Sequence, residues 1–205
     1  DVLAKFKKDL EKASNKEITE TDLEESIQTF NLIRENLTKL YTLKSQDPEI
    51  IKGADLYAIV KGSMIMDRDD LTRLLPAIVD TLEKTSPEKK DKKRIVVSGS
   101  ICDSPDIYTA IEDAGGVVVG DDLCTGQRWF EGLILQDKDP LTAIAWRYAD
   151  RMTCPAKHTS LTLRGKNIVS LAKKNRAHGV IFMLLKFCDP HAFDYPYLKE
   201  ALDKE

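Results

Sequence analysis

The chain has 205 residues, a net charge of -3 and a hydrophobic content of 42%, which together describe a globular protein with room for one or two domains. This balance argues against a nucleic-acid partner, and no apolar run approaches the roughly 20 residues that cross a membrane. The four cysteines do not indicate a disulfide-stapled secreted domain, so we expect reduced thiols in a cytoplasmic protein, either buried or bound to metal.

The first 86 residues are predicted to form a helical segment. Apolar residues recur at helical spacing over residues 1–13, and Thr21 with Glu24 fits a capping box at the start of a long helix. Asp47-Pro48 should end this helix, and a less regular helical region follows over residues 54–82. The polar run over 86–94 is predicted to be a solvated linker, because acidic residues interrupt its lysines.

From residue 94 the pattern changes to strands that alternate with helices. Short apolar runs predict strands at 95–97, 117–119 and 179–185, with helical patterns between them. Such alternation indicates parallel strands joined by helices. The sequence therefore predicts an α/β domain over 94–205, with a parallel Rossmann-like (flavodoxin-like) sheet and flanking helices.

The two ends of the chain predict that more protein lies beyond them. The chain opens at Asp1 and stops at Glu205 within helical patterns. Three strands are also few for a doubly wound sheet, so we expect the α/β domain to be incomplete at its C-terminus and the chain to be part of a longer protein.

The run at 179–185 is a continuous apolar stretch, which favours a strand buried on both faces. Pro190 biases Asp189 away from a helical conformation, so we expect a loop over 186–194 and a helix from about Tyr195. Cys188 would then lie just past the carboxyl end of a buried strand, where open α/β sheets bind ligands.

A cysteine follows each predicted strand, at Cys102, Cys124 and Cys188. Thiolates that meet at one edge of a parallel sheet are candidate ligands for an iron–sulfur cluster. The alternative is that these cysteines are small buried apolar side chains. A zinc site formed by Cys154 with His158 and by Cys188 with His191 is a weaker alternative, because the spacing is loose and the two pairs belong to different elements.

Small residues follow the first predicted strand. Ser98-Gly99-Ser100 could form a tight turn that approaches a phosphate group, as in coenzyme A, or a plain turn between strand and helix. The spacing of a dinucleotide-binding loop is missing. Arg128 and Trp129 follow the second cysteine loop, where they could contact an anion and a flat ring, or pack the sheet edge.

Three stretches carry a family resemblance. SGSICDSPDIYTAIEDAGGVVVGDDLCTGQRWF (98–130) and HGVIFMLLKFCDP (178–190) resemble the 2-hydroxyacyl-CoA dehydratase and benzoyl-CoA reductase family, and residues 16–43 look like that family's middle region. The resemblance implies the C-terminal part of an oxygen-sensitive enzyme subunit, without its N-terminal domain and last strand. Such a subunit pairs with a homologous sister subunit, holds a [4Fe-4S] cluster, and receives an electron from an ATP-hydrolysing iron–sulfur activator protein.

The resemblance also implies a reaction. In the dehydratases a (R)-2-hydroxyacyl-CoA loses water through a ketyl radical after one-electron reduction, whereas the reductases reduce an aromatic ring. We favour the dehydratase, with the benzoyl-CoA reductase type as the alternative, and expect this piece alone to be inactive. A non-catalytic α/β binding or electron-carrier module is the alternative of another class.

The resemblance and the residue pattern together suggest candidate site residues. Cys188 is the favoured cluster ligand and Cys124 a less favoured one, while the remaining ligands are expected in the N-terminal domain. No catalytic residue is assigned. The candidate acyl-CoA pocket comprises Ser98, Gly99, Ser100, Asp122, Cys124, Thr125 and Arg128.

Overall fold

The computed structural model describes residues 2–88, 90–151, 154 and 161–205. The helices before the sheet are α1 (Val2–Ser14), α2 (Glu20–Gln46), α3 (Gly53–Ile65) and α4 (Arg68–Glu83). The strands are β1 (Lys93–Gly99), β2 (Gly116–Asp122) and β3 (Gly179–Met183). The helices of this half are α5 (Asp106–Asp113), α6 (Gln127–Phe130), α7 (Pro140–Asp150), α8 (Leu161–Lys174) and α9 (Asp189–Asp203).

The start of α2 differs from the prediction. Its capping box is formed by Thr19 and Asp22, not by Thr21 and Glu24. The Thr19 hydroxyl accepts a hydrogen bond from the Asp22 N–H at 3.1 Å, and the Asp22 carboxylate accepts from the Thr19 N–H at 2.8 Å. An aspartate at the third helical position reaches the cap backbone, as a glutamate does in the usual motif, so the helix begins before the predicted cap. The end of α2 at Asp47 is confirmed.

The three strands form one parallel sheet in the order β2-β1-β3, which confirms the predicted fold class. Successive residues of the strands face opposite sides. Val97 and Val118 pack with Tyr108 and Ile111 of α5 on one face. The other face, which includes Val96, Val117 and Val119, packs with Ile168 of α8 and Leu198 of α9.

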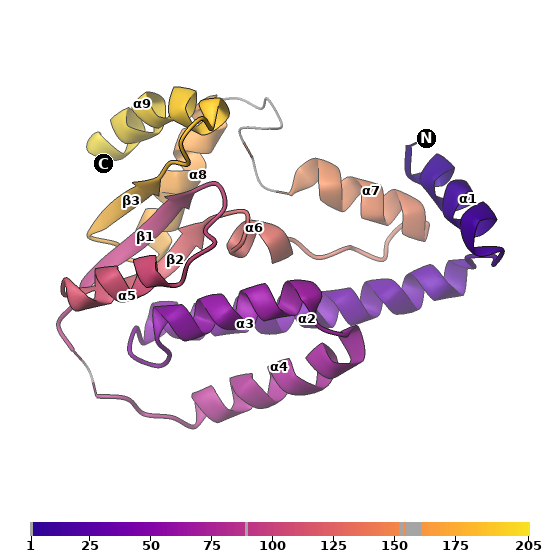
Figure 1. Cartoon of the computed structure of the whole chain (residues 1–205), viewed down its shortest axis with the longest axis horizontal. Helices are drawn as coiled ribbons and strands as arrows, with labels where there is room; N and C mark the ends of the chain where they lie inside the picture. Colours follow the sequence, from indigo (N-terminus) through magenta and orange to yellow (C-terminus); the bar gives the residue numbers. More distant parts are fainter. Residues whose placement is uncertain (1, 89, 152–153, 155–160) are drawn as a thin grey trace.

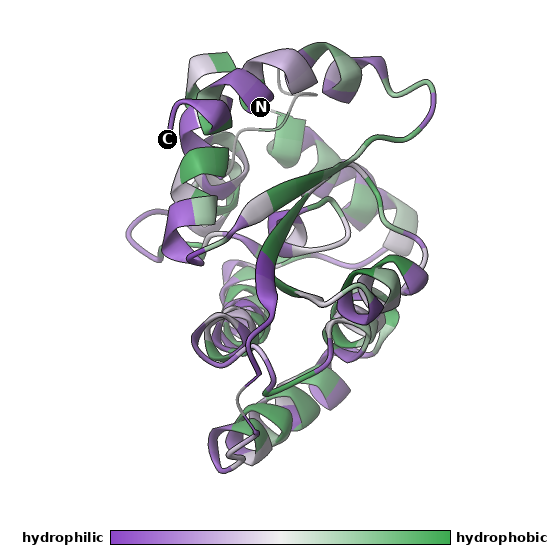
Figure 2. Ribbon diagram, turned by 90° about the vertical axis from the view of Figure 1, so that its left-hand side faces the viewer, coloured by the Kyte–Doolittle hydropathy of each residue, from purple (hydrophilic) through white to green (hydrophobic). Residues whose placement is uncertain are grey.

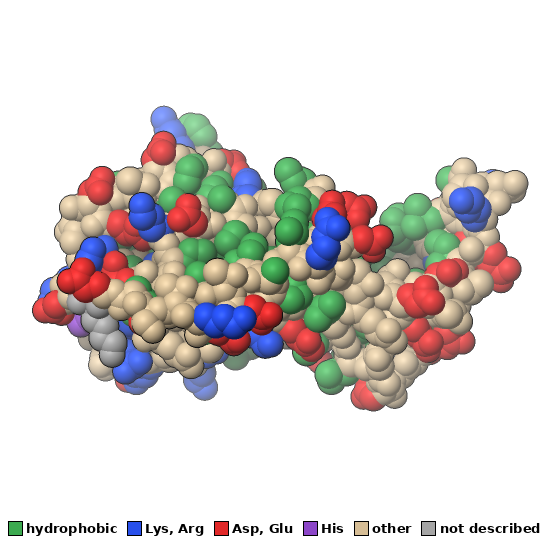
Figure 3. Space-filling model, turned by 90° about the horizontal axis from the view of Figure 1, so that it is seen from below, with side chains coloured by type: hydrophobic (Ala, Val, Ile, Leu, Met, Phe, Trp, Pro, Cys, Tyr) green, Lys and Arg blue, Asp and Glu red, His purple; other side chains and the backbone are tan. Residues whose placement is uncertain are grey.

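The helical segment lies beside the sheet in layers (Figures 1 and 2). Helices α2 and α3 lie next to the sheet and α5, and α4 lies on their far side. Their shared core is apolar, with Leu37, Leu40, Val60, Leu71 and Val79 buried together. The face of the molecule seen from the α4 side presents hydrophobic side chains between charged ones (Figure 3). The division into domains at 1–86 and 94–205 stays a prediction.

The prediction that the third strand is buried on both faces is wrong for this chain. β3 pairs only with β1 among the described residues, so it lies at the edge of the sheet. Its residues are half-buried or exposed, and 37% of Ile181 is accessible. β2 is also an edge strand but is buried, because α5, α2, α6 and α3 pack against it. β3 has less cover from helices, which leaves its apolar side chains partly open.

The predicted start of α9 is also wrong. The helix begins at Asp189, not near Tyr195, and Pro190 lies in its first turn. Proline is tolerated there because the first N–H groups of a helix have no intrahelical partner. Cys188 is consequently the N-cap residue of α9 and does not lie in a long loop. None of the described helices has the length and apolarity needed to cross a membrane.

Candidate functional site

The direction of the chain reverses around β1, the central strand. The connection through α5 leads from β1 to β2 on one side, and the chain then returns to β3 on the other side. In open α/β sheets such a reversal leaves a crevice at the carboxyl ends of the strands, where ligands bind. In this chain, Cys102 follows the carboxyl end of β1 and Cys188 follows that of β3.

The structure moves part of the predicted phosphate turn into the sheet. Ser98 and Gly99 are the last residues of β1, and Gly99 pairs with Met183 of β3. A Cβ atom on Gly99 would lie 2.1 Å from the Met183 carbonyl oxygen, so close strand pairing accounts for this glycine. The buried Ser98 hydroxyl donates to the Asp122 carboxylate at 3.0 Å, across the β1–β2 pair.

The loops after β1 and β2 are tied together by hydrogen bonds to their backbones. The Cys124 N–H donates to the Ser100 carbonyl at 2.8 Å. The Thr125 hydroxyl accepts from the Cys102 N–H at 3.0 Å and lies 3.1 Å from the Cys102 carbonyl, to which it donates. These contacts bring together three of the predicted site residues at one edge of the sheet: Ser100, Cys124 and Thr125. The Thr125 side chain connects the two loops.

Asp122 and Arg128 form a buried charged contact at this edge. Arg128 donates from Nε and Nη2 to the two Asp122 carboxylate oxygens, each at 2.7 Å. Burial alone would lower the pKa of Arg128, but the hydrogen bonds and charge of Asp122 raise it above its usual value. The remaining Nη1 lies 3.6 Å from the Cys124 sulfur. Arg128 is only 6% exposed, and its fork is already engaged by a carboxylate.

Asp121 is the residue that the sequence interpretation missed. Its side chain is 1% exposed and accepts hydrogen bonds from the Tyr41 hydroxyl, from the Gln127 N–H at 2.9 Å and from the Leu123 N–H at 3.3 Å. Burial raises the pKa of Asp121 to about 6, although these hydrogen bonds oppose the shift. A Cβ atom on Gly126 would lie 1.9 Å from Asp121 Oδ1, so the loop closes tightly around the carboxylate.

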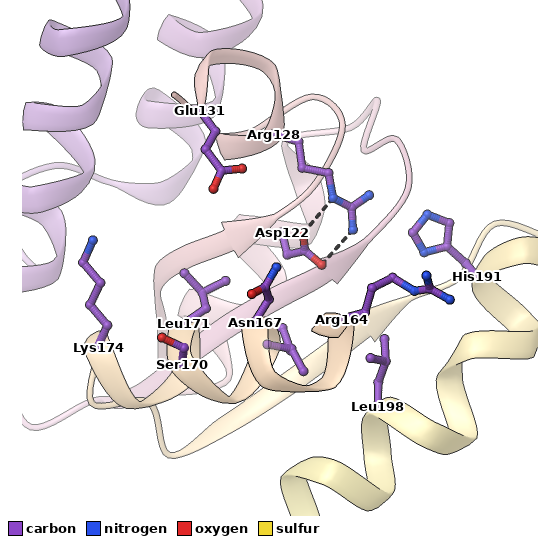
Figure 4. Close-up of a pocket in the computed structure, with 11 residues that line it drawn as sticks. Asp122, Arg128, Glu131, Arg164, Asn167, Ser170, Leu171, Lys174, His191 and Leu198 are labelled. Atoms are coloured by element: carbon purple, nitrogen blue, oxygen red, sulfur yellow. Dashed lines mark hydrogen bonds and ion pairs between the residues drawn. The ribbon is translucent and has the colours of Figure 1, made fainter. Parts of the chain in front are cut away.

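A cavity of about 230 Å³ lies beside the Asp122–Arg128 pair (Figure 4). Its lining comes mostly from α8 and α9 and from the end of β2: Asp122, Arg128, Glu131, Arg164, Asn167, Ile168, Ser170, Leu171, Lys174, His191 and Leu198. Figure 4 shows Glu131 and Arg128 on the side opposite α8, with Asn167 between α8 and the ion pair. Within the described part of the chain, the buried Oε2 atom of Glu131 has no hydrogen-bond partner.

Two ionisable groups of this cavity have shifted pKa values. Burial raises the pKa of Glu131, and the negative charge of Asp122 adds to the effect. Burial lowers the pKa of His191, and the nearby Arg128 guanidinium lowers it further. Both shifts favour the neutral form of each group, as expected in a partly desolvated site.

An ion pair that the sequence interpretation did not anticipate holds α9 in place. Arg164 of α8 donates from Nη2 to Asp194 Oδ1 of α9 at 2.8 Å, and both side chains are buried. The two residues are 30 positions apart, so no local pattern could reveal the contact. Because Cys188 caps α9, this pair also fixes the position of Cys188 relative to α8.

The cysteines do not assemble as one ligand set. The described residues hold no group of three or more His, Cys, Asp or Glu side chains that could bind a metal ion. Cys102 is buried, its thiol donates to the Ser104 carbonyl at 3.2 Å, and burial raises its pKa, which favours a structural role. Cys124, Cys154 and Cys188 are half-buried, and His158 lies outside the described residues. A ligand set made of all three loop cysteines, one of the alternatives left open by the sequence, is therefore not found in the part of the chain described.

Comparison with known proteins identifies the family. The profile described as "2-hydroxyglutaryl-CoA dehydratase, D-component" matches residues 1–205. The (R)-phenyllactyl-CoA dehydratase beta subunit of Clostridium sporogenes is 30% identical over 95% of the chain and 52% of its own length. One of the subunits of the benzoyl-CoA reductase of Thauera aromatica is 26% identical over 97% of the chain and 52% of its own length.

A third relative points to the same group. The beta subunit of the (R)-2-hydroxyglutaryl-CoA dehydratase of Acidaminococcus fermentans is 28% identical over 99% of the chain and 55% of its own length. The chain thus spans about half the length of the curated relatives it matches. With the profile match over its whole length, the chain belongs to the family of the 2-hydroxyglutaryl-CoA dehydratase D-component.

Proposed function

We propose that this chain is the C-terminal part of an iron–sulfur subunit of a (R)-2-hydroxyacyl-CoA dehydratase. The subunit would act in the cytoplasm with a homologous sister subunit and an ATP-hydrolysing iron–sulfur activator, and eliminate water from a 2-hydroxyacyl-CoA through a ketyl radical. The observation that carries this proposal is the position of Cys188 beside the sheet reversal, together with the family match over the whole chain.

Cys188 fits one position of a [4Fe-4S] cluster but does not complete a site. Its thiol is half-buried at the start of α9, next to the carboxyl end of β3, and such a sheet edge is a usual place for a cofactor. A cubane cluster needs several thiolates, and the described residues bring no three candidate ligands together. We therefore assign one ligand to this chain and the others to the remainder of the longer protein. When bound, the cluster would supply one-electron transfer.

The residues at the end of β2 and in the loop after it would bind the acyl-CoA. Thr125 joins the two cysteine loops by hydrogen bonds, and Asp122, with Ser98, orients Arg128 beside Cys124. Asp122 accepts from Nε and from one N–H of Nη2, so the other N–H groups of Arg128, including those of Nη1 beside the Cys124 sulfur, would approach an anionic or carbonyl group of the substrate.

The alternative is a subunit that reduces the ring of an aromatic acyl-CoA. The benzoyl-CoA reductase relative is similar over 97% of the chain, at an identity close to that of the dehydratase relatives. An assay of the full complex with a (R)-2-hydroxyacyl-CoA and with benzoyl-CoA separates the two. Ring reduction without dehydration would favour the reductase.

The cluster assignment is tested in the full-length protein with its sister subunit, purified without oxygen. We expect Cys188→Ser to lower the iron and sulfide bound per protein and to abolish dehydration, because the serine hydroxyl is a poor cluster ligand. Cys102→Ser is the matched control: it changes a cysteine at the same sheet edge, and its hydroxyl can still donate to the Ser104 carbonyl.

The control should keep its iron and sulfide. If Cys188→Ser retains as much iron and sulfide as the Cys102→Ser protein, the ligand assignment is wrong. If neither substrate is converted by the unaltered complex, the proposed activity is wrong whatever the iron content.

A further inference from the structure

We propose that Asp121 is a positioning residue of this site, because its carboxylate, held by Tyr41 of α2, sets the turn that presents Cys124 and Arg128. The sequence interpretation placed Asp122 in the pocket and gave its neighbour no role. The functional consequence of the inference rests on the proposed function, whereas the conformation of the turn can be tested without it.

The two aspartates at the end of β2 serve opposite faces of the sheet. Asp122 lines the cavity beside α8 with Arg128. Asp121 turns to the other side, where the Tyr41 hydroxyl of α2 donates to its Oδ2 atom. Adjacent residues of a strand point in opposite directions, so Asp121 cannot itself reach the cavity that Asp122 lines. Its influence on the site must pass through the backbone.

That backbone is wound around the Asp121 carboxylate. Oδ1 accepts from the N–H groups of Leu123 and Gln127, which lie on either side of Cys124. Gly126 allows this approach, since a Cβ atom there would lie 2.7 Å or less from both carboxylate oxygens. The turn from Leu123 to Gln127 is therefore built on one buried side chain, and its far end leads directly into α6 and Arg128.

Tyr41 fixes the carboxylate from outside the turn. The tyrosine is buried in the helical core and packs its ring against Phe130 of α6, with ring centroids 5.3 Å apart. Burial raises the pKa of Tyr41 well above its usual value, so it donates as a neutral hydroxyl. The same tyrosine thus contacts both the carboxylate at the start of the turn and the helix after it.

The test compares Tyr41→Phe and Asp121→Asn with Val79→Ala in the full-length protein and its sister subunit. Val79 of α4 is buried in the helical core and lies outside the turn, so Val79→Ala lowers stability without touching Asp121. We measure thermal unfolding, the rate of Cys124 alkylation by iodoacetamide resolved by peptide mass spectrometry, and kcat and KM for the acyl-CoA.

We expect Tyr41→Phe and Asp121→Asn to raise the Cys124 alkylation rate by about fivefold, the change that follows from losing one hydrogen bond that holds the turn closed. KM for the acyl-CoA should rise by about as much, with a smaller change in kcat. Val79→Ala should change neither the alkylation rate nor KM, even if its melting temperature falls as much as those of the two turn variants.

The inference is overturned if the alkylation rates and KM values of both turn variants match those of Val79→Ala. If Asp121→Asn does not fold, Tyr41→Phe decides alone, since it retains the ring packing and removes only the donor. Absence of activity in the unaltered complex contradicts the proposed function but leaves the alkylation result to decide the role of Asp121.

Discussion

Two adjacent aspartates at the end of β2 show how different the environments of neighbouring residues can be. Asp122 keeps an ion-paired partner in Arg128 at the wall of a cavity. Asp121 is fully enclosed, and its partners are a neutral hydroxyl and two backbone N–H groups. A carboxylate without a cationic partner in a buried site loses solvation that hydrogen bonds only partly replace. This difference explains why the pKa of Asp121 rises to about 6.

The raised pKa predicts a pH dependence of stability. Folded Asp121 has a pKa of about 6 against a reference value of 3.8, so between these values the folded protein binds the proton more tightly than the unfolded chain. The free energy of unfolding that this group contributes is fully present below the lower value and falls as pH rises towards about 6. Over this window the loss is on the order of 3 kcal/mol.

Urea unfolding of the full-length protein and of Asp121→Asn at pH values of about 4.5, 5.5 and 7 checks this sign. The negative charge of Asp122 also contributes to the raised pKa of Asp121. Asparagine does not titrate, so the free energy of unfolding of the unaltered protein minus that of Asp121→Asn should decrease as pH rises. A difference that stays constant or increases contradicts the pKa shift.

At the scale of secondary structure, the strands and helices were predictable from local patterns and their surroundings were not. The apolar runs near Val97, Val118 and Ile181 predicted three parallel strands because a buried strand needs continuous apolar residues. The same run at β3 predicted burial on both faces, and it could not reveal that β3 lies at an edge in this chain. Burial depends on neighbouring elements, which periodicity does not describe.

For the candidate site, too, the local features could be predicted from the sequence and the long-range contacts could not. The cysteine loops were predictable because the carboxyl ends of parallel strands share an edge. The Asp121–Tyr41 and Arg164–Asp194 contacts join residues 80 and 30 positions apart, so only the packed structure brings them together. Gly99 was expected in a turn that either approaches a phosphate group or simply joins strand and helix, yet its missing side chain makes room for the carbonyl of β3.

The pairing of β1 with β3 predicts a strong effect of Gly99→Ala. The new methyl group would lie 2.1 Å from the Met183 carbonyl oxygen, and backbone atoms of paired strands cannot move apart without losing hydrogen bonds. We expect a loss of about 2 kcal/mol or more in unfolding free energy. Amide hydrogen exchange should also become faster in β3 than in β2, since β3 has only this pairing among the described residues.

Gly62→Ala is the matched control for that variant. Gly62 lies within α3, where a Cβ atom would meet only the Met66 sulfur at 3.7 Å, an ordinary contact. Alanine is favoured over glycine in a helix, so stability should stay equal or rise by up to about 1 kcal/mol. Equal effects of the two substitutions would show that the β1–β3 approach is less tight than the structure indicates.

At the scale of the whole molecule, α2 connects parts that are distant in the sequence. Near its middle, Asn31 forms two hydrogen bonds with Ile134: its Nδ2 donates to the carbonyl at 2.8 Å, and its Oδ1 accepts from the N–H at 3.0 Å. Towards its end, Tyr41 holds the Asp121 turn. One rigid helix thus fixes both the segment before α7 and the turn before α6.

The Asn31 and Tyr41 contacts lie at different places along α2, so we expect that each can be removed without loosening the segment held by the other. Asn31→Ala removes both hydrogen bonds to Ile134, so the backbone N–H and carbonyl of Ile134 lose these partners. We expect the free energy of unfolding to fall by about 1–3 kcal/mol. We expect hydrogen exchange in the full-length protein to become faster over 132–150, the segment that carries α7. Exchange at Leu123 and Gln127 should stay unchanged, because Tyr41 still holds Asp121.

Tyr41→Phe should give the converse pattern, with faster exchange in the turn and no change in α7. The reason is that the phenylalanine keeps the ring against Phe130 and loses only the hydroxyl that holds Asp121, while Asn31 still binds Ile134. Faster exchange of both segments in both variants would mean that α2 does not hold them independently. The site after β2 and the α7 segment would then open as one cooperative unit.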